Sequence, residues 1–319
     1  MSHPQPAAED PPDRPRASTT VPVGTFGGAS ALPVLAGVTI GSFTRRGLQV
    51  RAERVQGSLA LRAGLLDGTF LVVHAAPDNI IAWRDEAGLQ VKAWIGGSNG
   101  PIALVARHAR TVHDLRGARI AVDAPGSGFA PILRSILAGA GLAEADVLIT
   151  QLGATRGRYE ALRDGRVDAT MLTLPWTTLA ERDGATVLAD HRAVAPDLLT
   201  SCGASLAPWL GSARGRALAA AYVAGYAEAV AWLRDETNDP AATAALALET
   251  GIESGVAREV LAMMRDPAVG WPPDGAIRLA GMAAVAALRA TVAGPPHESV
   301  DAYLDTGPTA RLASARASR

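Results

Sequence analysis

Apolar and polar positions in the first third of the chain follow two periods in turn. Short apolar runs predict buried strands, and between them apolar residues three and four positions apart predict helices. Glycine-containing turns separate these segments. The expected strands are 21–25, 48–55, 70–73, 91–95 and 102–106, and the expected helices are 31–43 and 58–66. This alternation predicts βα units that build a parallel sheet with helices on both faces.

The same alternation begins again after residue 117, which indicates a second unit of the same kind. The expected strands there are 119–123, 147–151 and 167–172, and the expected helices are 129–140 and 159–163. Two such blocks predict two doubly wound α/β lobes. From residue 214 the chain becomes alanine-rich, and we expect a helical C-terminal part. Its expected helices are 218–233, 241–250, 255–264 and 277–293.

Composition narrows the classes of function. With 48% hydrophobic and 19% charged residues in 319, the chain has the profile of a folded protein. Its 30 basic and 31 acidic side chains leave a net charge of −1, which disfavours binding to nucleic acids or anionic membranes. A single cysteine, Cys202, excludes an internal disulfide and a cysteine-based zinc cluster. His108, His113 and Asp114 lack the spacing of a ligand pair, so we predict neither a metal nor a cofactor.

The N-terminal segment has two parts. Residues 1–20 are rich in proline and polar residues, which predicts a disordered leader. Residues 21–44 are uncharged, but prolines and glycines interrupt them repeatedly. These breakers argue against a signal peptide and against a membrane span. We therefore expect a cytoplasmic protein, and a start codon at another position would change this expectation to an extracytoplasmic one.

Several motifs along the chain are similar to landmarks of a known family. They are Leu-Pro at 32–33, Gly-Leu-Gln-Val at 47–50, Leu-Asp-Gly at 66–68, Asp-Leu-Arg-Gly at 114–117 and Asp-Gly-Arg-Val-Asp-Ala at 164–169. In this order they resemble the type II periplasmic binding proteins of the nitrate, taurine and alkanesulfonate group, the NMT1-like proteins. The resemblance covers roughly residues 21–293.

The resemblance implies two α/β lobes joined by a hinge, with the second lobe inserted into the first. A small ligand would be held between the lobes as they close, and an ABC transporter permease would be the protein partner. The implied division is lobe 1 at 21–106 and 200–304, lobe 2 at 107–199, and a frayed tail at 305–319.

Related sequences on the same fold are enzymes, among them a sulfinate desulfinase, decarboxylases of aromatic acids and a thiamine-pyrimidine synthase. The desulfinase resemblance implies a catalytic cysteine in the first loop, where this chain has the sequence Gly-Gly-Ala-Ser at 27–30. The cysteine-rich segment of the pyrimidine synthase is absent from the sequence as well. We interpret Cys202 as a small buried thiol, because no histidine is adjacent to activate it.

Ligands of open α/β sheets bind beyond the carboxyl ends of the strands, so the loops after strands form the candidate site. Two of these loops, 24–30 and 125–129, are rich in glycine and precede an expected helix. Backbone N–H groups and the helix dipole there favour a carboxylate or sulfonate, and an ordinary tight turn is the alternative. The candidate ligand-binding residues in these loops are Thr25, Gly27, Gly28, Ser30, Ser127, Gly128 and Phe129.

Further candidates follow other strands. His74 ends a predicted strand, where it either contacts the ligand or packs as a hydrogen-bonded core residue. Asp78 either points into the cleft or caps the next helix. Trp176 and its polar neighbour Thr173 follow a strand at a place where the resemblance implies side chains that stack on the ligand. Arg156 is a candidate for bidentate contact with a carboxylate.

The sequence leaves two hypotheses of function. The first is a binding protein that closes on a small organic acid, a carboxylate or sulfonate with an aromatic or apolar body, and serves an ABC transporter. The alternative is a cytoplasmic decarboxylase, lyase or hydrolase on the same fold, with His74 as general acid or base. The expected lack of a signal favours the enzyme, whereas the lack of an evident nucleophile or base–orienter pair favours the binding protein.

Overall fold

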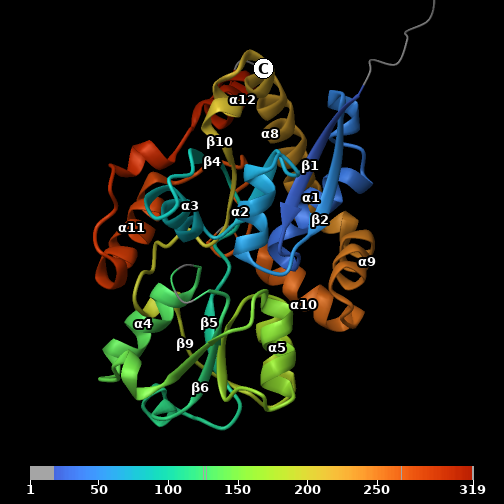
Figure 1. Cartoon of the computed structure of the whole chain (residues 1–319). Coiled ribbons are helices and arrows are strands. Elements are labelled where there is room, and N and C mark those ends of the chain that lie inside the picture. The colour runs from blue at the N-terminus through green and yellow to red at the C-terminus, as the bar shows by residue number, and fades with distance from the viewer. Residues whose placement is uncertain (1–17, 125, 127, 267, 318–319) are drawn as a thin grey trace, which may run out of the picture.

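The computed structural model describes residues 18–124, 126, 128–266 and 268–317. It shows two α/β lobes, each built on a five-stranded sheet (Figure 1). The first sheet has the spatial order β2 (Leu48–Arg54), β1 (Thr19–Thr25), β3 (Val72–Ala75), β10 (Cys202–Leu206), β4 (Val91–Gly96). The second has the order β7 (Leu148–Gln151), β6 (Arg119–Val122), β8 (Ala169–Leu172), β5 (Ala103–Ala106), β9 (Thr186–Asp190). These sheets confirm the predicted two-lobed α/β fold.

The two sheets share one topology. In each, the fourth strand is the one that enters from the other lobe, β10 in the first sheet and β5 in the second. Both run antiparallel to their two neighbours, whereas β1–β3 and β6–β8 are parallel. The expectation of wholly parallel sheets is therefore wrong for these two strands. Each of these strands follows a short crossing between the lobes, whereas parallel neighbours in one sheet are joined by a long crossover that is usually an α-helix.

The two crossings are short. The first runs through residues 97–102 between β4 and β5, and the second through residues 191–201 between β9 and β10. Since β5 belongs to the second sheet, the first lobe ends before residue 103 and not at residue 106 as expected. The second lobe is thus an insertion between two adjacent strands of the first sheet.

Helices cover both sheets (Figure 1). Those of the second lobe are α4 (Ala130–Gly139), α5 (Thr155–Arg163) and α6 (Trp176–Arg182). The others are α1 (Leu32–Thr39), α2 (Ser58–Leu66), α3 (Pro77–Asp85), α7 (Ala207–Gly211), α8 (Ala213–Arg234), α9 (Asp239–Thr250), α10 (Ser254–Arg265), α11 (Leu279–Ala293) and α12 (Gly307–Ala317). Short 3-10 helices are η1 (Ala29–Ala31), η2 (Thr44–Arg46), η3 (Val112–Leu115), η4 (Glu144–Asp146), η5 (His191–Ala193), η6 (Glu236–Asn238) and η7 (Val300–Tyr303).

Both chain ends differ from the expectation. Of the predicted leader, residues 1–17 lie outside the described part of the chain, and β1 begins at Thr19, two residues earlier than expected. The expected frayed tail contains α12, which contacts α8 and β4. Just before it, Asp305 donates its backbone N–H to the carbonyl of Ala93 at 2.9 Å. Leu304 and Thr309 are buried, so apolar burial holds this segment on the first lobe.

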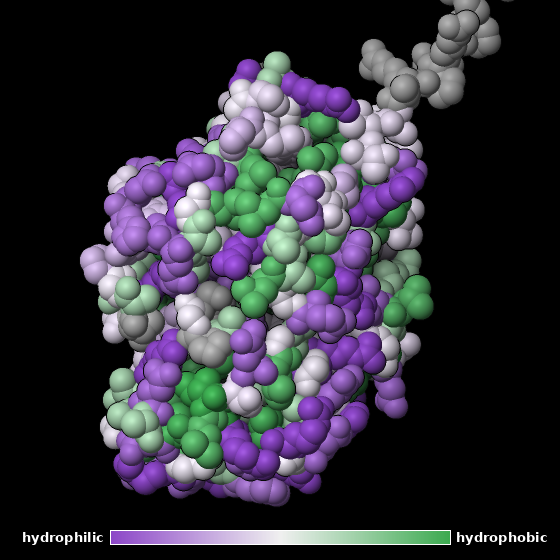
Figure 2. All heavy atoms as spheres, in the orientation of Figure 1, coloured by the Kyte–Doolittle hydropathy of each residue, from purple (hydrophilic) through white to green (hydrophobic). Residues whose placement is uncertain are grey.

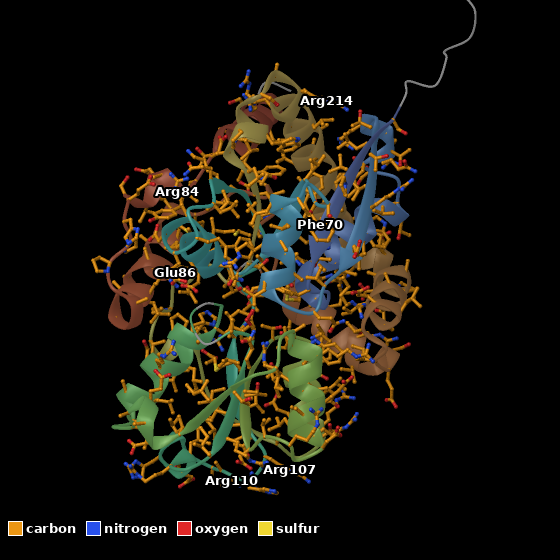
Figure 3. All side chains as sticks on the ribbon, in the orientation of Figure 1. Phe70, Arg84, Glu86, Arg107, Arg110 and Arg214 are labelled. Atoms are coloured by element: carbon orange, nitrogen blue, oxygen red, sulfur yellow. The ribbon has the colours of Figure 1, made fainter. Side chains whose placement is uncertain are left out.

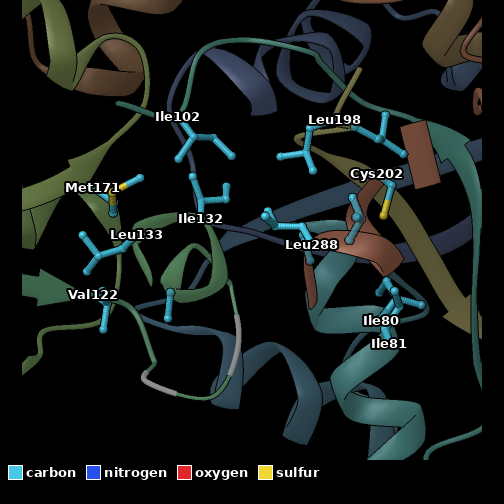
Figure 4. Packing of buried hydrophobic residues seen from close by; sticks show 14 of the residues in the cluster. Ile80, Ile81, Ile102, Val122, Ile132, Leu133, Met171, Leu198, Cys202 and Leu288 are labelled. Carbon is cyan, nitrogen blue, oxygen red and sulfur yellow. The ribbon is translucent and has the colours of Figure 1, made fainter. Parts of the chain in front are cut away.

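The hydrophobic core is continuous across the lobe boundary. Ile81 of α3, Ile132 of α4 and Leu288 of α11 belong to one cluster of buried side chains (Figure 4). Helix α11 contacts α3 in the first lobe and α4 in the second. Ile102 and Leu198, one from each crossing, complete this contact region. Apolar packing therefore holds the lobes together on the side of α11.

The surface shown in Figure 2 mixes hydrophilic residues with smaller apolar patches on both lobes. Among the described residues, no helix combines the length and the apolar character that crossing a bilayer requires.

Candidate functional site

A cleft between the lobes lies at the carboxyl ends of β1, β3 and β8. Its volume is about 60 Å³. A buried water needs about 10–15 Å³ by this measure, so the cleft has room for a ligand of a few non-hydrogen atoms. The predicted site residues that line it are Gly27, Ser30, His74, Phe129, Thr173 and Trp176. Half of the ligand-binding residues predicted from the sequence therefore lie together in this cleft, and they come from both lobes.

Three nominated residues lie beside the cleft without lining it. The hydroxyl of Thr25 accepts a hydrogen bond from the backbone N–H of Gly27 at 3.2 Å, which fixes the turn after β1. Gly28, with φ of 77°, lies against Leu174 of the other lobe. The guanidinium of Arg156 lies 5.8 Å from the ring centre of Trp176. Arg156 therefore packs against Trp176, which lines the cleft, and does not line the cleft itself.

Of the loop at 125–129, Ser127 lies outside the described residues, and Gly128 lines a smaller cavity next to the cleft. Asp78 lines that smaller cavity too. Its carboxylate accepts hydrogen bonds from the guanidinium of Arg289 at 3.1 and 3.2 Å. Burial raises the pKa of Asp78 to about 6, against the lowering effects of Arg289 and the backbone N–H of Gly128. The helix-capping interpretation is wrong, because Ala76 is the N-cap of α3.

His74 is held beneath the cleft by an aromatic cluster. Its Nε2 is 2.9 Å from the hydroxyl of Tyr222, and its ring stacks on Tyr226 with centroids 5.7 Å apart. The hydroxyl of Tyr222 and Nε2 of His74 thus satisfy each other by one hydrogen bond. Nδ1 is buried with no hydrogen-bond partner among the described residues. Burial lowers the pKa of His74 to about 4, so the ring is neutral near pH 7.

Sequence reasoning missed the hydroxyl groups of the crossings. Ser98 of the first crossing and Thr200 and Ser201 of the second line the cleft. The hydroxyl of Thr200 donates to the carbonyl of Ser98 at 2.7 Å, which couples the two crossings. Thr155, the first residue of α5, lines the cleft as well. The turn-rich sequence at 96–101 was the available signal, but only the lobe arrangement shows that it faces the cleft.

The cleft has an unusual electrostatic composition. None of the described residues that line it carries a formal charge, since His74 is neutral. The labelled arginines Arg84, Arg107, Arg110 and Arg214 lie towards the periphery of the molecule (Figure 3). Helices α1 and α3 of the first lobe and α4 and α5 of the second all begin at or next to lining residues. Their N-termini carry partial positive charge and favour an anion.

Cys202 follows the lining residue Ser201 but does not itself line the cleft. It begins β10 with no exposed surface and belongs to the hydrophobic core shown in Figure 4. Burial raises the pKa of Cys202 well above its usual value, so the reactive thiolate is suppressed. The interpretation of Cys202 as a packed core residue agrees with this environment.

Two lobes of one topology, joined by two crossings around a cleft, define the type II periplasmic-binding fold. The chain belongs to the NMT1-like family, whose model matches residues 14–247. A search of curated proteins found no match.

Solved structures are similar over most of their length. One is a protein of Bordetella bronchiseptica RB50, with 21% identity, coverage of 93% of this chain and 98% of that chain, and a TM-score of 0.79. The periplasmic nitrate-binding protein NrtA of Synechocystis PCC 6803 has 12% identity, coverage of 93% and 89%, and a TM-score of 0.77. The alkanesulfonate-binding protein SsuA of Xanthomonas axonopodis pv. citri, bound to MOPS, has 20% identity, coverage of 84% and 90%, and a TM-score of 0.69. At these identities the likeness establishes the fold.

Proposed function

We propose that this protein binds a small organic acid with a single negative charge in the cleft between its lobes, as the substrate-binding component of an ABC importer. The observation that carries this proposal is the convergence of helix N-termini from both lobes on a cleft without charged side chains. Helix dipoles, backbone N–H groups and hydroxyls stabilise one negative charge. A second negative charge would be buried with no cation to pair with it, which is costly.

Two further observations support the proposal. The similar structures include proteins described as nitrate-binding and alkanesulfonate-binding, and nitrate and alkanesulfonates are monoanions. The apolar part of the lining, with Phe26, Phe129, Trp176 and Met264, suits the hydrocarbon body of an organic acid.

The enzyme hypothesis gains no support from the site. With a pKa of about 4, His74 carries no second proton near pH 7 and is a poor general acid. Its Nε2 is engaged with Tyr222. Among the described residues, those that hydrogen-bond to or stack on His74 are tyrosines and not carboxylates. The thiol of Cys202 is buried in the core. Binding without chemical conversion therefore fits the geometry best.

Mass spectrometry and calorimetry test the proposal together. Purified protein is titrated with monoanions such as propionate, benzoate and ethanesulfonate, and with the dianions succinate and ethanedisulfonate. We expect a monoanion to bind, to be recovered unchanged, and to stabilise the fold by about 2.7 kcal/mol at 100 times its Kd. Tighter binding of the dianions, or recovery of a decarboxylated or hydrolysed product, would contradict the proposal.

Matched variants locate the binding. Ser30→Trp places an indole in the cleft and is expected to abolish binding, because the ring occupies the space that the ligand needs. Ser254→Trp, at the exposed start of α10, is the control and is expected to bind like the wild type. Urea unfolding of both variants shows whether they remain folded. Fractionation of source cells tests the importer role separately, since that role requires a location outside the cytoplasm.

A further inference from the structure

A small chamber adjoins the cleft at the boundary between the lobes. It shares Phe26, Ala76, Phe129 and Thr155 with the lining of the cleft. Its volume is about 20 Å³, which is room for one or two water-sized groups at about 10–15 Å³ each. Asn79, Asp123 and Arg158 supply its polar wall.

Two polar side chains of this wall have buried atoms that lack a hydrogen-bond partner. Asn79, in the first turn of α3, has 0% of its surface exposed, and neither its amide oxygen nor its amide nitrogen has a partner among the described residues. Asp123, just after β6, is 8% exposed, and its Oδ1 has no such partner either. A buried polar atom without a hydrogen bond costs about 1–3 kcal/mol. Asn79 belongs to the first lobe and Asp123 to the second. The chamber between the lobes is therefore lined by unpaired polar atoms from both.

The guanidinium of Arg158 does not satisfy Asp123. Arg158 is 1% exposed and donates to the carbonyl of Met171 at 3.1 and 3.2 Å and to the hydroxyl of Thr155 at 3.2 Å. It also donates to the carbonyl of Gly153. The guanidinium is thus committed to the backbone of its own lobe. Its positive charge acts on Asp123 at longer range. This charge and a hydrogen bond with the Ser58 side chain oppose the rise in the pKa of Asp123 that burial causes. The carboxylate therefore has one side-chain partner, and its Oδ1 is left without one.

We propose that this chamber is a second polar subsite, which receives a hydrogen-bond donor carried by the bound acid, an ammonium or a hydroxyl group. Oδ1 of Asp123 and the amide oxygen of Asn79 accept from that group, one from each lobe. The ligand class is therefore a small monocarboxylate or monosulfonate with an amino or hydroxyl substituent. This inference rests on the proposed function, because the anionic end of the same ligand occupies the cleft.

The chemistry of the chamber excludes other substituents. A second carboxylate would face the Asp123 carboxyl group in a volume of about 20 Å³ and would be repelled when that group is ionised. A methyl group would fit but would leave Oδ1 of Asp123 and the amide oxygen of Asn79 without partners. The subsite therefore discriminates by hydrogen bonding, which separates ligands more sharply than apolar contact does.

Two matched series of acids test the subsite by calorimetry. The carboxylate series is propionate, hydroxypropionate and β-alanine. The sulfonate series is ethanesulfonate, isethionate and taurine. In the wild type we expect a donor-bearing acid to bind roughly 10–100 times more tightly than the unsubstituted acid of its series, the range of a hydrogen bond to a charged group. Tighter binding of the amino acids identifies an ammonium as the preferred donor, and tighter binding of the hydroxy acids identifies a hydroxyl.

Variants assign the preference to the chamber. Asp123→Asn and Asn79→Ala are expected to reduce the preference to within about threefold, with the affinity for propionate and ethanesulfonate retained. Asp168→Asn is the control. Asp168 forms an exposed ion pair with Arg119, and this variant is expected to keep the preference for donor-bearing acids. Equal affinity of all members of a series in the wild type would overturn the inference whether or not the variants fold. If none of the six acids binds, the proposed function fails, and the inference fails with it.

Discussion

His191 connects the two crossings between the lobes, and its titration gives stability a defined pH dependence. The ring is 2% exposed, and its Nδ1 accepts a hydrogen bond from the backbone N–H of Ile102 at 3.2 Å. The backbone N–H of His191 donates to the carbonyl of Ile102 at 2.9 Å. Protonation of Nδ1 would break the first of these bonds. Burial accordingly lowers the pKa of His191 to about 4, with Arg192 lowering it further and Asp190 opposing.

The sign and size of the effect follow from this pKa. An imidazole that titrates near 6.5 in the unfolded chain and near 4 in the folded protein binds fewer protons when folded. Its contribution to the free energy of unfolding is complete above pH 6.5 and is lost progressively as the pH falls from 6.5 to 4. Linkage gives a loss of about 2 kcal/mol between about pH 7 and about pH 5 for this single group.

Urea unfolding of the wild type and of His191→Gln at these two pH values measures this contribution. The glutamine carbonyl can still accept from Ile102 but does not titrate, so we expect the pH-dependent loss to shrink by about 2 kcal/mol. His74 also has a pKa of about 4, but it is present in both proteins and cancels in the difference. His113→Gln, at an exposed position, is the control and should leave the loss unchanged. An equal loss in His191→Gln and the wild type would refute the reasoning.

Two other predictions concern the core and the lobe boundary. Because Cys202 has no exposed surface and a raised pKa, we expect a thiol reagent to react with the protein only when urea unfolds it, and rapid labelling of the native protein would contradict this burial. At Gly153, with φ of 65°, a Cβ would lie 2.3 Å from the carbonyl oxygen of Gln56 in the other lobe. Gly153→Ala should therefore separate the lobes, seen as a larger radius of gyration by small-angle X-ray scattering and as weaker ligand binding. Gly184→Ala, with φ of 88° and no heavy atom within 4 Å of the Cβ, controls for backbone strain, and equal effects of the two variants would rule out the contact as the cause.

The local pattern of apolar residues was sufficient to predict the two α/β units. The spacing of apolar residues in a helix or strand reflects which of its faces is buried, and this can be read from the segment alone. The helix expected at 58–66 matches α2 in both of its bounds, and the strand expected at 21–25 lies within β1. The direction of β5 was not predictable in this way, and β10 was not predicted as a strand at all. Each is a short apolar segment whose orientation depends on which lobe the preceding residue occupies, and local periodicity carries no such information.

The residues of the candidate site also fall into those that the sequence predicted and those that only the tertiary structure shows. Residues such as Ser30 and Trp176 were found because the loop after a strand has a known place in this type of sheet. The environment of His74 was not predictable, because its partner Tyr222 lies 148 positions later in the chain. Asp123 and Arg158 were missed for a similar reason. They line a chamber that side chains of both lobes enclose, and no local pattern in the sequence shows such an arrangement.

The two crossings join the lobes and also line the cleft. The carbonyl of Ser98 accepts hydrogen bonds from the hydroxyl of Thr200 and, at 3.1 Å, from the backbone N–H of Ser201, and all three residues line the cleft. A Cβ at Gly97 would lie 2.8 Å from the backbone of Ser201, so glycine permits this close pairing of the crossings. For the lobes to separate, these same segments must change conformation. The proposed ligand, on contact with these hydroxyls, would interact differently with an open and a closed arrangement of the lobes. Such a difference in affinity is the quantity that allows binding to shift a protein towards closure.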